Sequence, residues 1–306
     1  MNRSSYLPYA ALAAICLIWG TTYLALRIAV VGFPPFLFIT IRQLIAGSIL
    51  ILFMLTVGKA KLPGKRQILK QAICGFFMLS MGNGLVAWAE VNIPSGIAAI
   101  ICSMMPMWVI LINLTINKDE KPTVPILLGV AIGFAGIIMI FGEHVQEFSN
   151  MQYLLGILMT FLATLCWAGC SVWMKKNPSD GDPFVNAGLQ MFFAGVWLIP
   201  FTLVFDDLTA VTWSSDAVYS MIYLILVGSI IAYTCYTFAL RSLPMTIVSL
   251  YTYVNPLVAV VLGWLVLDEK LNMQIVVAFL LTVGGIYIVN RGYQLRDAWK
   301  AQFSGR

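Results

Sequence analysis

Two ionisable side chains, Arg42 and Glu90, lie in stretches of the sequence that are otherwise long and apolar. A charge in apolar surroundings is costly, so such a group usually faces a cavity or another charge. One interpretation is an ion pair that locks the two segments together. In a second, both line an outer vestibule, where Glu90 attracts a cationic or zwitterionic ligand or exchanges a proton. In a third, Glu90 pairs with Arg27, which leaves Arg42 to bind a carboxylate or backbone carbonyls.

Two tryptophans, Trp19 and Trp167, occupy the interiors of apolar runs. An indole there can pack against neighbouring helices, or it can form the wall of an amphipathic pocket and stack on aromatic or cationic ligands. Thr22 and Tyr23 add hydroxyl groups beside Trp19, although a helical threonine can also bond its own backbone. These residues therefore predict either close packing or a ligand pocket.

Further polar side chains occur where the helical backbone is weakened. Asn83 is flanked by two glycines, and Trp88 follows one turn after the second of them. Tyr251 and Asn255 precede Pro256, whose missing N–H frees a carbonyl that needs a partner in the protein or in cavity water. We predict a pocket lined by Trp19, Thr22, Tyr23, Asn83, Trp88, Trp167, Tyr233, Tyr251 and Asn255, with Tyr236 and Tyr253 as packing residues.

The composition places these residues in lipid. Of the 306 residues, 60% are hydrophobic and 10% are charged, and the mean hydropathy of +0.90 leaves too little polar surface to cover a soluble globule. A bilayer core needs about 20 apolar residues as helix. Because such runs recur along the chain, we predict an all-α membrane protein with ten transmembrane helices. They are expected at 7–29, 34–57, 67–91, 95–116, 123–141, 151–174, 183–205, 216–240, 245–267 and 272–290.

The positive charges indicate the orientation, because Lys and Arg collect in cytoplasmic loops. With a cytoplasmic N-terminus, most of the 18 Lys and Arg residues fall on the cytoplasmic side, whereas the loops at 143–150 and 206–216 carry acids and no Lys or Arg. We therefore predict that both termini are cytoplasmic. The net charge of +5 reflects this topology and an attraction to anionic lipid headgroups, so no nucleic acid partner is predicted.

The two halves of the sequence echo one another. The matching landmarks, in order, are Trp19 with Trp167, Pro35-Phe36 with Pro183-Phe184, Pro94 with Pro244, Pro106 with Pro256, and Gly136 with Gly285. Each predicted unit has five helices, an odd number, so the second unit is inverted relative to the first. Inverted repeats place a shared cavity near the membrane midplane and let one set of helices rock against another. We expect the repeats at 1–142 and 151–290, followed by a basic cytoplasmic tail at 291–306.

Two smaller patterns have structural interpretations. An Asp-Glu-Lys triplet occurs at 119–121 and again at 268–270, and both are predicted to cap the helices that follow. The glycines Gly133, Gly136, Gly284 and Gly285 are predicted to be positions where helices pack closely.

Several of these motifs resemble the EamA family of the drug/metabolite transporter superfamily. They are Ile18 to Tyr23, Pro34-Pro35 with Arg42, Pro94-Ser95-Gly96, and Asn255-Pro256 followed by Asp268-Glu269. The segments Gly82-Asn83-Gly84 and Ala89-Glu90 are similar to those of the YedA-type inner-membrane members. The resemblance covers two EamA repeats and implies a multi-pass protein of the bacterial cytoplasmic (inner) membrane that exports small metabolites, amino acids or amphiphilic compounds.

We therefore predict a secondary transporter that works by alternating access and is not an enzyme. Its pocket is expected from helices 1, 3, 4, 6, 8 and 9, while helices 5 and 10 form scaffold or homodimer surfaces. An importer or exchanger of small organic solutes is the nearer alternative, and a membrane-embedded enzyme or sensor is the more distant one. No nucleotide-binding loop, metal-spaced cluster or nucleophile with a base occurs in the sequence, so no cofactor or metal is predicted.

Overall fold

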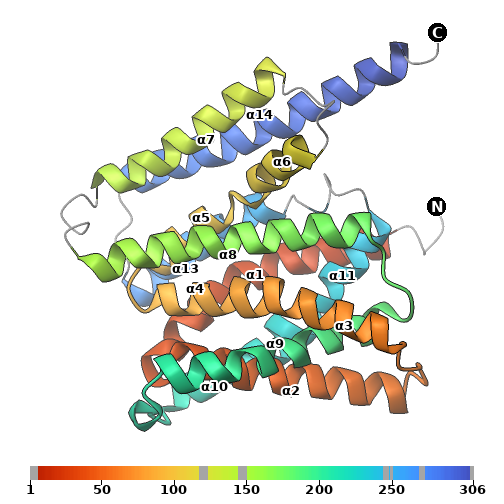
Figure 1. Ribbon diagram of the computed structural model, residues 1–306. Helices are drawn as coiled ribbons and strands as arrows, with labels where there is room; N and C mark the ends of the chain where they lie inside the picture. Colours follow the sequence, from red (N-terminus) through yellow and green to blue (C-terminus); the bar gives the residue numbers. More distant parts are fainter. Residues whose placement is uncertain are drawn as a thin grey trace.

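The computed structural model describes residues 6–116, 123–143, 150–243, 248, 251–268 and 273–303, and every regular element within these ranges is helical. The helices lie roughly alongside one another (Figure 1). Those that are long and apolar enough to cross a membrane are Leu7–Gly32, Pro35–Thr56, Lys65–Glu90, Ser95–Ile112, Met151–Lys176, Pro183–Phe205 and Ser215–Ser242. Shorter apolar helices occur at Val124–Gly136, Val254–Leu267 and Met273–Val289. The predicted all-helical membrane architecture is confirmed.

Prolines set the start of the first helices. α1 (Leu7–Gly32) has a proline in its first turn, and Pro34 directly precedes α2 (Pro35–Thr56). A proline in the first turn loses no helical hydrogen bond, and it disfavours helix in the residue before it. Phe33, the residue before Pro34, is extended. α1 therefore runs through to Gly32, one turn beyond the predicted end at Ala29.

The third predicted helix is one rod with an irregular centre. It consists of α3 (Lys65–Cys74), the π-helical segment η2 (Gly75–Met81) and α4 (Gly82–Glu90). The fourth is divided into α5 (Ser95–Cys102) and α6 (Met105–Ile116). The cause of the break is Pro106, because a proline ring clashes with the carbonyl four residues earlier and donates no N–H. α7 (Val124–Glu143) completes the first half.

Side-chain caps begin the helices of the second half. Asn150 caps α8 (Met151–Lys176), Asp182 caps α9 (Pro183–Phe205) and Ser214 caps α10 (Ser215–Tyr223), each by accepting a backbone N–H. A short helix, η4 (Leu208–Ala210), lies between α9 and α10. The remaining elements are the π-helical η5 (Leu224–Ile231), α11 (Ala232–Ser242), α13 (Tyr251–Leu267) and α14 (Met273–Phe303).

The C-terminal helix differs from its predicted extent. α14 continues through Asn290 to Phe303, so most of the predicted basic tail is helical. This segment is rich in Gln, Arg, Lys, Leu and Ala, which favour helix. The predicted start of the preceding helix at Met245 and most of the Asp-Glu-Lys caps lie outside the described residues.

Glycines allow several helix pairs to pack at backbone distance. Between α2 and α9, a Cβ at Gly47 would lie 2.3 Å from the backbone nitrogen of Phe192. Between α7 and α14, a Cβ at Gly285 would lie 2.4 Å from the backbone nitrogen of Gly133. Small residues permit this approach in membranes. The prediction for Gly284 is wrong, because a Cβ there would meet nothing within 4 Å. The α7–α14 pair lies at one margin of the molecule (Figure 1).

The main hydrophobic core lies between the other helices. Its largest fully buried side chains include Tyr236, Phe33, Phe38 and Met78. Many large apolar side chains are exposed on the outer faces, as expected for helices that contact lipid. The start of α1 and the end of α14 lie at the same end of the helices (Figure 1).

Candidate functional site

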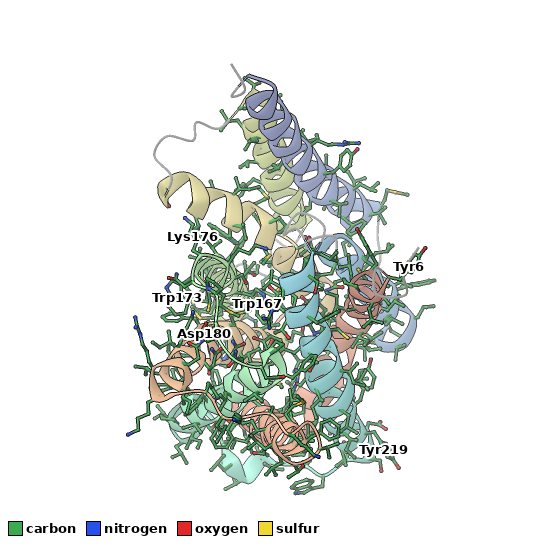
Figure 2. The ribbon with its side chains drawn as sticks, turned by 90° about the vertical axis from the view of Figure 1, so that its right-hand side faces the viewer. Tyr6, Trp167, Trp173, Lys176, Asp180 and Tyr219 are labelled. Atoms are coloured by element: carbon green, nitrogen blue, oxygen red, sulfur yellow. The ribbon has the colours of Figure 1, made fainter. Side chains whose placement is uncertain are left out.

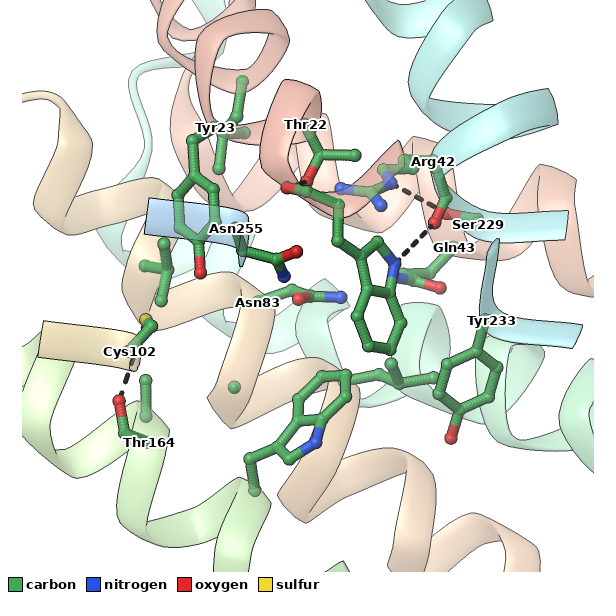
Figure 3. Close-up of a pocket in the computed structure, with 18 of the residues that line it drawn as sticks. Thr22, Tyr23, Arg42, Gln43, Asn83, Cys102, Thr164, Ser229, Tyr233 and Asn255 are labelled. Atoms are coloured by element: carbon green, nitrogen blue, oxygen red, sulfur yellow. Dashed lines mark hydrogen bonds between the residues drawn. The ribbon is translucent and has the colours of Figure 1, made fainter. Parts of the chain in front are cut away.

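A cavity of about 120 Å³ lies at the centre of the helices. One water needs roughly 10–15 Å³ by this measure, so the cavity has room for a small organic molecule. We call it the central chamber. It is lined by Trp19, Thr22, Tyr23, Leu26, Arg42, Gln43, Leu79, Gly82, Asn83, Val86, Cys102, Met105, Ala163, Thr164, Trp167, Met191, Gly228, Ser229, Tyr233, Tyr251 and Asn255. Both halves of the chain contribute to it, and Figure 3 shows the polar members.

The predicted tryptophans meet at this chamber. The ring centroids of Trp19 and Trp167 are 5.7 Å apart, with the rings nearly perpendicular at 89°. Trp19 also packs against Tyr236 and Tyr251, at 5.1 Å in each case, and Trp167 against Tyr233 at 6.4 Å. Three of these four pairs are edge-to-face, a favourable arrangement of aromatic rings. We call Trp19, Trp167, Tyr233, Tyr236 and Tyr251 the aromatic wall. Viewed along the helices, Trp167 lies inside the bundle and Tyr219 lies at its margin (Figure 2).

Glycines and π-helical turns position these indoles. The Nε1–H of Trp19 donates to the carbonyl oxygen of Gly228, at 3.3 Å, in η5. On the other side, a Cβ at Gly82 would lie 2.9 Å from Cε3 of Trp167. Trp19 therefore contacts η5 of the second half, and Trp167 contacts the residue that follows η2 in the first half. π-helical turns are rare and frequently occur at functional sites.

One end of the chamber carries the buried charge. Arg42 is only 6% exposed, and the Nε of its guanidinium donates to Ser229 Oγ at 2.8 Å. The neighbouring amide, Gln43, is 1% exposed, and its Oε1 has no hydrogen-bond partner among the described residues. In Figure 3, Arg42, Gln43 and Ser229 lie together, away from Cys102 and Thr164. The chamber is thus polar and positive at one end.

The remaining polar groups are partly engaged by the backbone. Thr22 Oγ1 donates to the carbonyl of Trp19 at 2.7 Å, the backbone bond that a helical threonine can make. When the side-chain amide of Asn255 is turned so that its nitrogen faces the two backbone carbonyls, it donates hydrogen bonds to Tyr251 and Cys16. Its nitrogen therefore braces α13 against α1, one residue before Pro256.

The structure brings together most of the predicted pocket residues. Trp19, Thr22, Tyr23, Asn83, Trp167, Tyr233, Tyr251, Asn255 and Arg42 all line the chamber. Trp88 and Glu90 do not line it. Glu90 is fully buried at the end of α4. Tyr236 is fully buried in the aromatic wall, as predicted for a packing residue, and the side chain of Tyr253 lies outside the described part of the chain.

Trp88 lines a second hollow, which we call the outer recess. It holds about 360 Å³ and lies at the ends of α1, α4 and α9, where Pro34, Asn92 and Asp206 also line it. Asp206 Oδ2 accepts a hydrogen bond of 2.5 Å from the backbone N–H of Leu37, in the first turn of α2. Burial raises the pKa of the Asp206 carboxyl, and the backbone hydrogen bonds oppose that rise.

A polar network, buried at Gln71, Gln190 and Tyr233, lies at the opposite end of the same helices. Gln71 on α3 donates to Ser179 Oγ at 3.0 Å and accepts from the Nε2 of Gln190 on α9 at 2.6 Å. The hydroxyl of Tyr233, which lines the chamber, donates to Gln190 Oε1. Lys70 donates to the carbonyl oxygen of Pro178 at 3.0 Å. We call this set the α3–α9 network, and it connects the loop after α8 with the chamber.

Sequence reasoning missed several lining residues. Gln43 and Ser229 hold or flank the buried guanidinium, and Thr164 lies 3.7 Å from the sulfur of Cys102. Gln43 carried a detectable signal, because it is an amide in an apolar run beside Arg42. Ser229 and Thr164 carried none, since small hydroxyl residues usually bond the helix backbone.

Membrane-length helices that enclose a partly polar chamber are typical of a membrane transporter. A model of the EamA-like transporter family matches residues 7–142 and 154–291. The chain therefore belongs to the EamA-like transporter family: it is a membrane transporter for a small molecule, and its surroundings are a lipid bilayer.

Relatives match over nearly the whole chain. It is 33% identical to the uncharacterized inner membrane transporter YedA of Escherichia coli (strain K12) over 304 residues, which are 97% of this chain and 95% of that one. It is 25% identical to the uncharacterized transporter YoaV of Bacillus subtilis (strain 168), with 90% and 94% covered. Protein PecM of Dickeya dadantii (strain 3937) is 28% identical, with 89% and 88% covered.

A solved crystal structure has the same fold. Its TM-score is 0.67 at 18% sequence identity, and the overlay covers 96% of this chain and 99% of that chain. The likeness concerns the fold alone.

Proposed function

We propose that this chain is a secondary transporter that exports small organic metabolites, amino acids or amphiphilic compounds by alternating access. The observation that carries the proposal is the central chamber, which residues of both halves line in the middle of membrane-length helices. A pocket at that depth can bind a solute from either side, provided that the helices open one end at a time.

We further propose that the chain is built as ten helices in two inverted five-helix EamA repeats, at 1–142 and 151–290, followed by the basic tail. The helix contacts support this. α2 packs on α9 and α7 on α14, which are equivalent positions of the two halves. The contacts of α1 with α11 and α13 are mirrored by those of α8 with α4 and α5. The π-helical segments η2 and η5 also occupy equivalent helices.

In this proposal the membrane is the bacterial cytoplasmic (inner) membrane, and both termini are cytoplasmic. The Escherichia coli relative is described as an inner membrane transporter. The loops that carry Lys and Arg support the orientation, since α3 begins Lys-Arg and α8 ends Lys-Lys, at one end of the helices. The outer recess then faces the periplasm, and the α3–α9 network faces the cytoplasm.

The aromatic wall would bind the apolar part of the solute, and Asn83, Tyr251 and Asn255 would contact its polar groups. We assign coupling to the two buried ionisable groups, Arg42 and Glu90. Full burial makes Glu90 sensitive to its surroundings, so its protonation can follow the opening of the site.

The test is transport by purified protein in liposomes. Efflux and uptake of a panel of metabolites, amino acids and amphiphilic compounds are measured with protein of known orientation. Export predicts net flux from the cytoplasmic side, and the opposite preference would identify an importer. Conversion of a panel compound by protein in detergent micelles, without sealed vesicles, would indicate an enzyme.

Glu90→Gln tests the coupling role. We expect altered transport, or an altered pH dependence of transport, with unchanged abundance of folded protein in the membrane. Asp216→Asn, at an exposed position in the first turn of α10, is the matched control and should transport as the unmodified protein does. Loss of folded protein in Glu90→Gln would favour a structural ion pair instead.

A further inference from the structure

The charged lining of the central chamber is entirely positive. Among its described lining residues, Arg42 is the only one that carries a full charge at neutral pH, and no Asp or Glu joins it. The other polar members are neutral amides, hydroxyls and indoles. Burying one uncompensated cation in a membrane protein is expensive unless a ligand or partner neutralises it. The chamber is therefore matched to a solute with a negative group.

The guanidinium has unused donors. It carries five N–H groups, and within the part of the chain that the structure describes its one hydrogen bond to protein is from Nε to Ser229. No ion pair of Arg42 occurs among the described residues. This leaves its terminal N–H groups to face the chamber that Arg42 lines. Those two nitrogens form the planar fork that binds a carboxylate by two parallel hydrogen bonds.

The backbone around the guanidinium is shaped to hold it. A Cβ at Gly228 would lie 3.3 Å from Nη2 of Arg42, so the glycine in η5 leaves the group its space. The next residue, Ser229, fixes Nε. Gln43 follows Arg42 on α2 and presents a buried Oε1 that has no partner among the described residues. A solute donor next to a carboxylate would satisfy that oxygen.

We propose that Arg42 is an anion subsite and that the transported solute is a small organic carboxylate with an apolar or aromatic body. The carboxylate binds the fork of Arg42, and the body lies against Trp19 and Trp167, whose rings are 5.7 Å apart. The proposal rests on the proposed transport function and names the substrate class of the same chamber.

The experiment measures binding by purified protein in lipid nanodiscs, using matched ligands that differ only in charge. The pairs are phenylacetate with phenylacetamide and indole-3-acetate with indole-3-acetamide, and phenyl phosphate represents the other common anion. We expect each carboxylate to bind about tenfold more tightly than its amide, the effect of one charge-assisted interaction. Arg42→Gln should remove this preference, and Arg42→Lys should retain part of it.

A matched arginine outside the chamber serves as control. Arg241→Gln changes an exposed residue in the last turn of α11 and should leave the preference intact. Ser229→Ala keeps the charge and removes the bond to Nε, so it should weaken carboxylate binding several-fold without affecting the amides. This second variant provides the test if Arg42→Gln does not yield folded protein.

Equal binding of carboxylates and amides would overturn the proposal, as would a preference that survives in folded Arg42→Gln. Failure of every carboxylate to bind the unmodified protein would also contradict it. Tighter binding of phenyl phosphate than of phenylacetate would overturn the proposed substrate class, because the anion subsite would then favour a phosphate over a carboxylate. Each of these outcomes would leave the proposed transport function standing, because none of them concerns flux. The transport function itself would fail through the absence of flux in liposomes.

Discussion

Trp19 joins the aromatic wall to the helix backbone of the other half of the chain. Its ring packs on Trp167, Tyr236 and Tyr251, and its Nε1–H donates to Gly228. Trp19→Ala and Trp167→Ala should each weaken binding of an aromatic ligand roughly two- to tenfold, since an aromatic contact contributes about 0.5–1.5 kcal/mol. Quenching or calorimetric titration in nanodiscs measures this effect.

Trp213 provides the control for that comparison. Its side chain is 74% exposed and lies outside the chamber, so Trp213→Ala should leave ligand binding unchanged. Unchanged binding in both chamber variants would mean that the wall only packs the helices. Trp19→Phe separates the two contributions of that residue, because it keeps a ring and removes the hydrogen bond to Gly228.

At this scale the sequence identified the residues that are unusual for their surroundings. Arg42, Trp19, Trp167 and Asn83 stand out as charge, bulk or amide in apolar runs, and all four line the chamber. Trp88 stands out in the same way, yet it lines the outer recess. Sequence position along a helix gives depth but not the direction of a side chain, which depends on the rotation of α4 against its neighbours.

At the scale of elements, two adjacent glycines on α14 test how helices pack. A Cβ at Gly285 would lie 2.4 Å from the backbone of Gly133 on α7, whereas a Cβ at Gly284 would meet no atom within 4 Å. Gly285→Ala must force the helices apart and should cost about 1–3 kcal/mol. Gly284→Ala should be neutral or stabilising by up to about 1 kcal/mol, because alanine favours helix.

Thermal unfolding in detergent compares the two variants. A lower midpoint is expected for Gly285→Ala alone. Equal midpoints would show that α7 and α14 do not approach at this position. The two variants change neighbouring positions on one helix by the same methyl group, so differences in expression or detergent binding cannot produce the contrast.

Helix starts were more predictable than irregularities within helices. Pro183 with Asp182 before it defines the start of α9, and the predicted range 183–205 is observed. The divided helix at Ser103 follows from Pro106, but the π-helical η2 and η5 have no comparable signal in the sequence. Gly228 lies within η5 and Gly82 directly follows η2, so the irregular turns occur where Trp19 and Trp167 contact the opposite half, and these contacts appear only in the packed structure.

At the scale of the molecule, the two hollows and the α3–α9 network are arranged along one axis. The rod from Lys65 to Glu90 begins at the network and ends beside the outer recess, and α9 runs between the same two ends. The central chamber lies between them. Hydrogen bonds of Gln71 with Gln190 and Ser179 would have to break before a solute could pass that end. An alternating-access transporter needs such a breakable closure at each end.

A reversible cross-link tests this whole-molecule motion. In a background without native cysteines, Gln71→Cys with Gln190→Cys replaces two side chains that bond at 2.6 Å. A short bis-methanethiosulfonate linker, which fills the space left by the two longer glutamine side chains, should hold this end closed, reduce flux in liposomes to background and leave ligand binding in nanodiscs intact, and a reductant should restore flux. The control pair, Thr40→Cys with Thr202→Cys, replaces hydroxyls that are 2.9 Å apart between α2 and α9. Three glycines, Gly47, Gly188 and Gly195, hold α2 and α9 at backbone distance along their length, whereas α9 meets η2 in this way only at Gly75 among the described glycines. We therefore expect α2 and α9 to move as one body, and their cross-link should leave flux unchanged. Full flux in protein cross-linked between positions 71 and 190 would mean that solutes do not pass this end of the molecule.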